Sequence, residues 1–481
     1  MSHPACSWRR LVVPYRVALV TGYLIWPAAH TDDWPRFLGP NGDGTSKETG
    51  LADAWPTNGP PQLWSKAVGT GYSAPSILGQ RLVLHHRESD QEIVECFEAA
   101  SGKSIWRQAT PSAFIDPYGY NNGPRATPLL TTNRCFTFGA EGGLRCLDLE
   151  TGREIWSRDT ARDFKVPEAF FGAGSSPLLE GNRLLVIVGG QPNAGVVALD
   201  PANGRTLWES VGRSNWEGQP MLGWPGERRV VWRDTDQQAS YATPIAATIH
   251  GRRIVFCLMR QGLVALDPAD GRVLFSRWFR ARVEESVNAA NPVVVGDLVL
   301  FSAAYYRVGS VLLRVGAQAG AFDEIWQSTV LETHWSTPIH HEGYLYALSG
   351  RNESDARFRC VELETGTLMW ERDERWRRTS RQPDAYGRGA AILADSKLIV
   401  LGEGGLLGMF AVDPTQPREL ARFQVSELAY PCWTAPVLSS GRLYLRGEDR
   451  LICMRLAVRL DPVVRQIEGY TGQGQSRDAR R

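Results

Sequence analysis

Arginines, aromatic residues and carboxamides stand just before many of the short apolar runs of this chain, and their types suit stacking and hydrogen bonding. Arg125 and Arg388 can each pair with a carboxylate through two parallel hydrogen bonds. Turns without a function would favour Gly, Asn, Asp and Ser instead. The candidate binding residues of this set are Arg125, Tyr241, Asn288, His334, Trp335, Arg388, Tyr430 and Trp433. Together they predict a polar-aromatic pocket, although each residue taken singly fits loop packing better.

Other arrangements that would support catalysis or metal binding are weaker. The pairs His85-His86 and His340-His341 have no carboxylate or cysteine at ligand spacing, so a strand or turn role fits them better. Asp236 and Asp384 are the only acidic residues loosely placed to act as a base. The chain has no Gly-Lys-Ser/Thr phosphate loop and no Gly-x-Ser-x-Gly elbow. Catalytic residues therefore stay unknown, and no metal ligands are assigned.

The overall composition excludes some classes of protein. The chain has 481 residues with 53 Lys+Arg and 52 Asp+Glu, a formal net charge of +1. A nucleic-acid binder would need a large basic excess, so no nucleic-acid partner is expected. Beyond Cys6, seven cysteines are spread widely, and four of them occupy a slot that holds alanine in related segments. They are predicted to act as small buried apolar residues, although Cys135 and Cys146 could approach each other on neighbouring strands.

The elements that position the candidates repeat at an interval of about 50 residues. Each unit reads as four short antiparallel strands joined by glycine turns, without a helical period. Five segments share an acidic residue, a glycine four positions later and an aromatic residue four positions after that. They are Glu98/Gly102/Trp106, Asp148/Gly152/Trp156, Asp200/Gly204/Trp208, Asp267/Gly271/Phe275 and Glu362/Gly366/Trp370. Because one such sheet leaves both faces wet, the units must stack, with the aromatic residue buried between neighbours.

Eight units can be counted. The aromatic positions, called wedge residues below, are Trp64, Trp106, Trp156, Trp208, Phe275, Trp326, Trp370 and Phe423. Trp64 precedes the first complete unit, and the last unit stops after three strands near Leu456, so the strand around Leu63 can complete it. The prediction is an all-β fold: an eight-bladed β-propeller of four-stranded antiparallel sheets, closed by pairing the N-terminal strand with the C-terminal blade. In such a ring the candidates would lie at one rim of the central channel.

The two ends of the chain are read separately. Arg9, Arg10 and Arg16 precede a short apolar run that ends in Ala28 and Ala29, as in a secretory signal peptide. We expect four parts. They are a signal peptide at 1–29, an N-terminal extended segment at 30–59, the propeller at 60–460 and a C-terminal tail at 461–481 that is expected to be disordered. No other apolar stretch is long enough for a transmembrane span, so the mature protein is expected to be periplasmic or secreted. We also expect it to be a monomer.

The repeats carry a resemblance to a known family. Thr151-Gly152-Arg153-Glu154-Ile155-Trp156 and Asn203-Gly204-Arg205-Thr206-Leu207-Trp208 resemble the tryptophan-docking motifs of quinoprotein-type, or PQQ-like, β-propellers. That superfamily holds the PQQ-dependent alcohol dehydrogenases and the BamB-like outer-membrane assembly proteins. The resemblance covers roughly residues 60–456. The segment from Trp34 to Gly42 also resembles the start of secreted PQQ-like propeller proteins common in planctomycete-type bacteria.

The resemblance implies two functions. A BamB-like member would be a scaffold that binds a protein partner or small ligand at the channel rim. A quinoprotein member would be an oxidoreductase of alcohols or sugars that holds PQQ with Ca²⁺. In that case Arg125 and Arg388 would pair the quinone carboxylates, and Trp335 or Trp433 would stack on it. The Ca²⁺ oxygens could come from Glu285, Asn288 and Asn291. The chain lacks the adjacent Cys-Cys pair typical of the alcohol-oxidising members, so no cofactor is certain.

Overall fold

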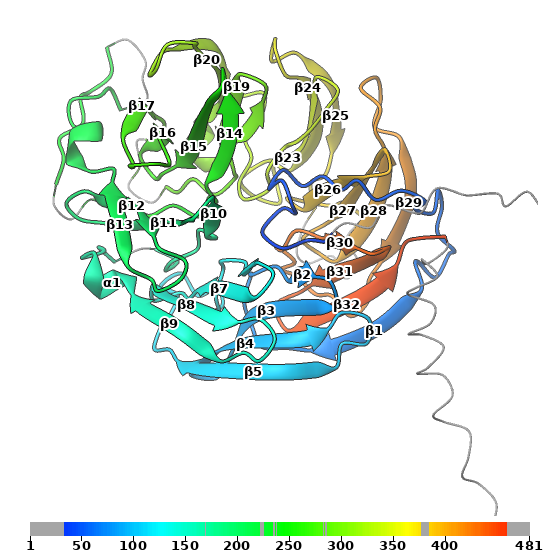
Figure 1. Ribbon diagram of the computed structural model, residues 1–481. Coiled ribbons are helices and arrows are strands. Elements are labelled where there is room, and N and C mark those ends of the chain that lie inside the picture. The colour runs from blue at the N-terminus through cyan, green and yellow to red at the C-terminus, as the bar shows by residue number, and fades with distance from the viewer. Residues whose placement is uncertain are drawn as a thin grey trace, which may run out of the picture.

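Eight four-stranded antiparallel sheets surround a common axis in the computed structural model of this chain (Figure 1). The structure describes residues 33–168, 170–221, 226–233, 236, 238–281, 283, 286–376 and 384–458. The predicted eight-bladed β-propeller is therefore confirmed. Helical structure among the described residues is limited to α1 (Thr160–Asp163), η1 (Arg213–Asn215) and η2 (Tyr305–Arg307). None of these has the length and apolar character that crossing a bilayer requires.

The blades are numbered in chain order, and the strands of each blade are given in order from the innermost, beside the channel, to the outermost. Blade 1 consists of β2 (Ser76–Leu78), β3 (Arg81–Glu88), β4 (Gln91–Glu98) and β5 (Ser104–Pro111). Blade 2 consists of β6 (Leu129–Leu130), β7 (Arg134–Phe138), β8 (Gly143–Asp148) and β9 (Glu154–Asp159). Blade 3 consists of β10 (Leu178–Glu180), β11 (Arg183–Gly190), β12 (Ala194–Leu199) and β13 (Thr206–Ser210). Blade 4 consists of β14 (Ile245–Ile249), β15 (Arg252–Leu258), β16 (Gly262–Leu266) and β17 (Val273–Trp278).

The remaining blades complete the ring. Blade 5 consists of β18 (Val293–Val295), β19 (Leu298–Ala303), β20 (Gly309–Val315) and β21 (Phe322–Ser328). Blade 6 consists of β22 (Ile339–His341), β23 (Tyr344–Ser349), β24 (Arg357–Glu362) and β25 (Leu368–Asp373). Blade 7 consists of β26 (Ala390–Ala394), β27 (Lys397–Leu401), β28 (Leu406–Ala411) and β29 (Glu419–Gln424). Blade 8 consists of β30 (Val437–Ser439), β31 (Arg442–Arg446), β32 (Arg450–Arg455) and, as predicted, the N-terminal strand β1 (Gln62–Ala67).

The wedge residues join each blade to the next. The indole N–H of Trp106 in blade 1 donates to the carbonyl of Leu149 in blade 2 at 2.9 Å, and its ring covers Gly152. Gly152 has φ of +72°, and a Cβ there would lie 2.5 Å from the Trp106 ring, so both the turn and the packing require glycine. Trp64 of β1 bonds Ala99 of blade 1 in the same way at 3.1 Å, which closes the ring.

Closer to the channel, a second set of bonds links neighbouring blades. Residues just before the innermost strands use a side-chain oxygen to accept the backbone N–H of the preceding blade. The N–H groups of Ala74 and Thr127 donate to Thr127 Oγ1 at 3.1 Å and to Ser176 Oγ at 2.8 Å. Thr243 and Asn291 repeat the arrangement with Asn291 Oδ1 at 2.7 Å and Thr337 Oγ1 at 3.0 Å. This polar girdle satisfies backbone groups that would otherwise be buried without partners.

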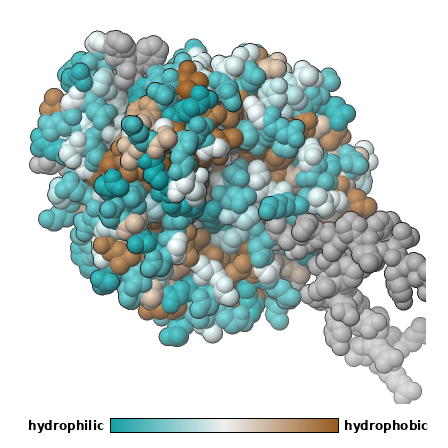
Figure 2. Space-filling view, turned by 45° about the horizontal axis from the view of Figure 1, so that its top comes forward, coloured by the Kyte–Doolittle hydropathy of each residue, from teal (hydrophilic) through white to brown (hydrophobic). Residues whose placement is uncertain are grey.

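The cysteines are packing residues, as predicted. All seven described cysteines are buried and free. Cys135 and Cys146 lie on the adjacent strands β7 and β8, but their partners in register are Leu147 and Phe136, so no disulfide joins them. The face of the molecule shown in Figure 2 is mainly polar, with apolar residues in small scattered groups.

The segment before β1 crosses the channel, in blue in Figure 1. Trp34 exchanges two backbone hydrogen bonds with Ile77 of blade 1, and Leu393 of blade 7 does the same with Gly44 and Ser46. The Glu48 carboxylate, 2% exposed, accepts the backbone N–H of Ser440 and Gly441 in the turn after β30. Because these contacts lie at the ends of the innermost strands, the segment covers the mouth of the channel opposite the predicted rim. We call residues 33–52 the plug.

Candidate functional site

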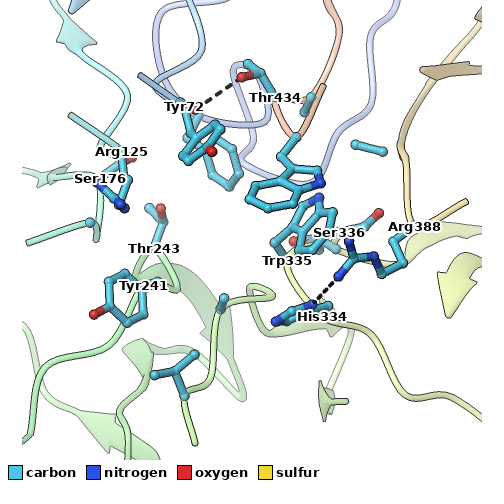
Figure 3. Close-up of a pocket in the computed structure, with 18 of the residues that line it drawn as sticks. Tyr72, Arg125, Ser176, Tyr241, Thr243, His334, Trp335, Ser336, Arg388 and Thr434 are labelled. Carbon is cyan, nitrogen blue, oxygen red and sulfur yellow. Dashed lines mark hydrogen bonds between the residues drawn. The ribbon is translucent and has the colours of Figure 1, made fainter. Parts of the chain in front are cut away.

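A cavity of about 180 Å³ lies between the plug and the loops that lead from the outermost strand of one blade to the innermost strand of the next. Phe37 and Leu38 of the plug line it from one side. Figure 3 shows Ser176, Thr243 and Tyr241 on one side of an open space, with His334, Trp335 and Arg388 on the other. The lining, called the cup below, is Phe37, Leu38, Tyr72, Tyr120, Arg125, Phe171, Gly174, Ser176, Tyr241, Thr243, Val287, Ala289, Tyr305, His334, Trp335, Ser336, Thr337, Arg388, Ala390, Ala391, Trp433, Thr434 and Ala435.

Aromatic rings from several blades touch one another around the cup. Trp433, in the loop before β30, has ring-centroid distances of 5.0 Å to Trp335, 5.1 Å to Tyr72 and 5.3 Å to Tyr120. The series continues from Tyr120 to Phe171 at 6.0 Å and from Phe171 to Tyr241 at 5.6 Å. In the other direction Trp335 meets His334 at 4.7 Å, and His334 meets Tyr305 at 5.0 Å. The wall of the cup is therefore largely a connected aromatic surface.

Arg388 is the most heavily bonded charge of the cup. Its Nη2 donates to Glu403 Oε2 at 2.7 Å and to Glu353 Oε1 at 3.0 Å, and its Nη1 donates to the Arg351 carbonyl at 2.7 Å. Glu403 is 0% exposed and also accepts the indole N–H of Trp433 at 3.0 Å. Burial opposes the guanidinium charge, but the two carboxylates prevail and raise the pKa of Arg388. The guanidinium lies over the Trp335 ring at 4.6 Å from its centroid.

Arg125 on the opposite side is bonded in a similar way. Its Nη2 pairs with the buried Asp116 carboxylate and donates to the Asn121 carbonyl at 3.1 Å, while Nη1 donates to the Gly123 carbonyl at 2.8 Å. Burial lowers the pKa of Arg125, and Asp116 opposes that effect. Both cup arginines are thus held by carboxylates and carbonyls of their own chain. Separating either pair would leave a buried charge without a partner, which costs about 3–5 kcal/mol.

His334 adds a polar group without a charge. Burial, reinforced by the positive charges of Arg388 and Arg351, holds the pKa of His334 well below its usual range. Its Nδ1 lies 3.5 Å from Arg388 Nη1, which suits a neutral imidazole that accepts there. Burial also raises the pKa of the Tyr305 hydroxyl to about 12. At ordinary pH the cup therefore presents neutral hydroxyls and a neutral imidazole beside its two paired arginines.

The structure brings six of the eight sequence candidates to the cup. These are Arg125, Tyr241, His334, Trp335, Arg388 and Trp433. Asn288 is not among the lining residues, because its buried amide donates to the carbonyls of Met259, Arg260 and Phe279 and holds a loop together. Tyr430 lies behind the wall, where its hydroxyl donates to Glu353 at 2.7 Å. Whether the six bind a ligand stays a prediction.

Some residues that line the cup were not predicted from the sequence. Phe37 and Leu38 come from the plug, outside the repeat, so counting repeat units says nothing of where they fold. Tyr305 lies in η2, in the turn between β19 and β20, and only its neighbour Tyr306 marks an aromatic pair there. Tyr120 stands in the same long loop as Arg125, and its clustering with Tyr118 was the available signal.

The weaker candidates have structural roles or fall outside the described residues. His85 and His86 are buried in β3 and face Glu92 and Glu95 of β4 at 3.3 Å each. His340 and His341 end β22, a strand position. Asp236 caps its own loop by accepting the Arg233 N–H at 2.8 Å. Asp384 contributes its backbone carbonyl to Arg422 at 3.2 Å.

A tricarboxylate quinone with Ca²⁺ does not fit this cup. Flat stacking partners are present in Trp335 and Trp433, but the arginines that would pair its carboxylates are already neutralised. Asn291 Oδ1 accepts the Thr243 N–H, and Glu285 lies outside the described residues. In the described part of the chain no group of three or more His, Cys, Asp or Glu could hold a metal ion. The volume also lies below the roughly 300–1,000 Å³ of common ligand sites.

Comparison with known proteins agrees with this architecture. A family model described as "Outer membrane protein assembly factor BamB" matches residues 52–220 and 89–372. Similar solved structures include BamB from Moraxella catarrhalis, at 16% identity and a TM-score of 0.54, covering 83% of this chain and 98% of that chain. A europium-containing methanol dehydrogenase has 13% identity, a TM-score of 0.60 and coverage of 88% and 89%. A quinohemoprotein alcohol dehydrogenase from Comamonas testosteroni has 12% identity, a TM-score of 0.51 and coverage of 89% and 81%. No curated protein matches the sequence. At these identities the structural likeness shows the fold.

Proposed function

This chain belongs to the family described as outer membrane protein assembly factor BamB, and on that premise we propose that it is an exported binding protein, a scaffold that holds a protein partner at the rim of its channel. In this function the chain acts by binding rather than by catalysis. The protein acts as a monomer in the periplasm or outside the cell. The predicted signal peptide, residues 1–29, lies outside the described residues.

The observation that carries this proposal is that both cup arginines are already paired with groups of their own chain. In a site that binds an anionic ligand, the cationic side chains have no carboxylate partner from the chain and pair with the charge of the ligand. Here the guanidinium of Arg388 donates to Glu403, Glu353 and a backbone carbonyl. The guanidinium of Arg125 pairs with Asp116 and donates to two backbone carbonyls. Their role is to brace the loops that carry the aromatic wall. A braced wall of neutral rings suits protein recognition, in which aromatic residues are enriched and charges are depleted at the centre.

The surroundings of the cup support the same conclusion. Tyr118 and Tyr120 are each 48% exposed, and Tyr306 is 44% exposed. The Arg351 guanidinium lies over the Tyr306 ring, 4.4 Å from the ring centroid. Rings held half in water at the edge of a concave site are the usual periphery of a protein interface.

A photo-crosslinking experiment tests the proposal. p-Benzoylphenylalanine replaces Tyr120 or Tyr306 at the rim, or Ile155 on the outer strand β9, in the full chain expressed in the cell that makes it. Ile155 is 37% exposed and lies far from the cup in the fold, so it serves as the matched control. We expect one discrete partner to be captured from both rim positions and not from the control. Equal products from all three positions, or none from the rim, would contradict the proposal.

Export has its own test. The mature protein is expected in the periplasmic or secreted fraction with an N-terminus near residue 30, since the apolar run ends in Ala28 and Ala29. N-terminal sequencing of the protein from each fraction reads this directly. A cytoplasmic protein that keeps Met1 would remove export from the proposal.

The alternative function is a PQQ-dependent oxidoreductase of alcohols or sugars. The fold likeness to the methanol and alcohol dehydrogenases and the adjacent rings of Trp335 and Trp433, 5.0 Å apart, favour it. The paired arginines oppose it, and so does Asn291 Oδ1, which already accepts the Thr243 N–H. A direct titration with the quinone separates the two functions and is described at the end of the Discussion.

A further inference from the structure

The cup is closed at one end, which limits what can enter it. The plug crosses the inner strands of blades 1 and 7, and Phe37 and Leu38 complete the lining on that side. An occupant must therefore enter from the rim and stop against the plug. The volume of about 180 Å³ is small for a cofactor and suits one large side chain. The cup thus has the size of a pocket for a single anchor residue.

The chemistry of the walls differs from side to side. Figure 3 shows Trp335 and His334 facing the space from one side, and Ser176, Thr243 and Tyr241 facing it from the other. The Tyr241 oxygen points away from the space and accepts the Phe171 N–H at 2.8 Å, so Ser176 and Thr243 supply the hydroxyl groups of this side. One side therefore offers flat rings, while the other offers hydroxyl groups. A flat side chain with a polar edge complements both sides at once.

Charge decides among the side chains that would fit. Each cup arginine has its carboxylate inside the chain, Asp116 for Arg125 and Glu403 for Arg388. A charged anchor would lose its hydration without meeting an uncompensated opposite charge. An aliphatic anchor would bury area but would gain nothing from the ring faces. Neutral aromatic residues remain as the best complement.

We propose that the cup receives one tyrosine or tryptophan side chain from a loop of the partner protein, and that this side chain is the anchor of the interface. The proposal rests on the binding function proposed above. The anchor ring packs against Trp335 and Trp433, whose planes are tilted by 45°, and its polar edge meets the hydroxyl side. The half-exposed rings of Tyr118, Tyr120 and Tyr306 then surround the anchor and exclude water from it, as residues around an interface hot spot do.

Short peptides test the proposal with the intact protein. The probes are Gly-Ser-Xaa-Ser-Gly peptides, acetylated and amidated, with Trp, Tyr, Leu, Arg or Glu at the central position. Isothermal titration calorimetry measures the affinity, and saturation-transfer NMR identifies which protons contact the protein. We expect the Trp and Tyr peptides to bind at least about tenfold more tightly than the other three. Equal or tighter binding of the Arg or Glu peptide would overturn the proposal.

A variant that fills the cup checks the location. Ala289 lines the cup and is only half-buried, so Ala289→Trp is expected to fill the space without disturbing the blades. It should lower the affinity for the Trp peptide by at least about tenfold, while Ile155→Ala should leave it unchanged. Unchanged binding by Ala289→Trp would place the anchor elsewhere and overturn the proposal. Thermal unfolding of both variants confirms that each is folded.

The two proposals fail in different ways. If the rim crosslinks a partner but the aromatic peptides do not bind, the binding function stands and the anchor is wrong. If neither occurs, the binding function itself fails. If the purified chain crosslinks to a second copy of itself through position 120, the partner is the chain itself, and the anchor from another protein is overturned.

Discussion

Aromatic residues do two different things in this molecule, at the junctions between blades and at the channel mouth. At the junctions each wedge tryptophan donates its indole N–H to a carbonyl of the next blade, as Trp156 does to Pro201 at 3.0 Å, and all of them except Trp370 also cover a glycine. At the mouth, rings meet other rings, and the indole N–H of Trp335 is buried without a hydrogen-bond partner. The first arrangement is complete within the chain. The second leaves ring faces on the wall of the cup and the indole N–H of Trp335 without a partner.

The comparison teaches how to separate packing from binding among similar residues. A structural aromatic residue has both its ring and its polar edge satisfied by the fold. A binding residue keeps part of its surface uncommitted at a cost that the rest of the fold must offset. By the same criterion Arg125 and Arg388 are structural, because their donors are already used. Residue type alone would have assigned them to a ligand.

The largest effect is expected at a junction. Trp156→Ala removes a ring that is 9% exposed and leaves a cavity between blades 2 and 3, so the free energy of unfolding should fall by about 3–5 kcal/mol. Urea unfolding followed by circular dichroism measures the change. The neighbouring Ile155→Ala, 37% exposed, is the control and should cost much less. A loss below about 1 kcal/mol for Trp156→Ala would break the distinction between the two regions.

The stability of the protein is expected to depend on pH through a buried carboxyl group near the channel mouth. Burial raises the pKa of Glu374, beside the loop that carries Arg388, to about 7 from 4.5. Because the folded state holds this proton more tightly, stability should be full below about pH 4.5 and fall as the pH rises to about 7. Relative to Glu374→Gln, the wild type should lose on the order of 3 kcal/mol between pH 4.5 and 8. Urea unfolding at both pH values measures this, and a constant difference would contradict it.

A smaller effect is expected in the polar girdle. Thr127→Val keeps the shape of the side chain but removes the oxygen that accepts the Ala74 N–H, at a cost of about 1–3 kcal/mol. Thr127→Ser keeps that oxygen and should cost less. Chemical unfolding of the two variants side by side measures the difference. If the serine variant were the less stable of the two, packing rather than the hydrogen bond would hold the girdle.

The smallest change in stability is expected at the rim. Tyr120→Ala removes a ring that is 48% exposed but also touches Trp433 and Phe171, so the free energy of unfolding should fall by only about 1 kcal/mol. Binding of the Trp peptide should nevertheless weaken. Unfolding and peptide titration of the same preparation test both statements. A large loss of stability would show that the rim packs the fold as the junctions do.

The fold could be predicted from the sequence because the junction chemistry leaves a fixed spacing. The turn of one blade, with its acidic residue and its glycine of positive φ, receives the wedge residue of the preceding blade, as Asp148 and Gly152 receive Trp106. The position of the cup followed too, since the residues before each innermost strand must lie at one mouth. What those residues do could not be predicted. The pairing of Arg388 with Glu403 joins a loop to a turn in the next hairpin, and the plug lies outside the repeat.

The central claim is that the cup has no place for an anionic cofactor, and a titration of the purified protein with PQQ and Ca²⁺ tests it most directly. We predict no stoichiometric quinone absorbance and no reduction of an electron-accepting dye with alcohols or sugars, in the wild type as in Arg125→Ala and Arg388→Ala. Stoichiometric quinone binding by the wild type, lost in both arginine variants and accompanied by dye reduction, would contradict the account.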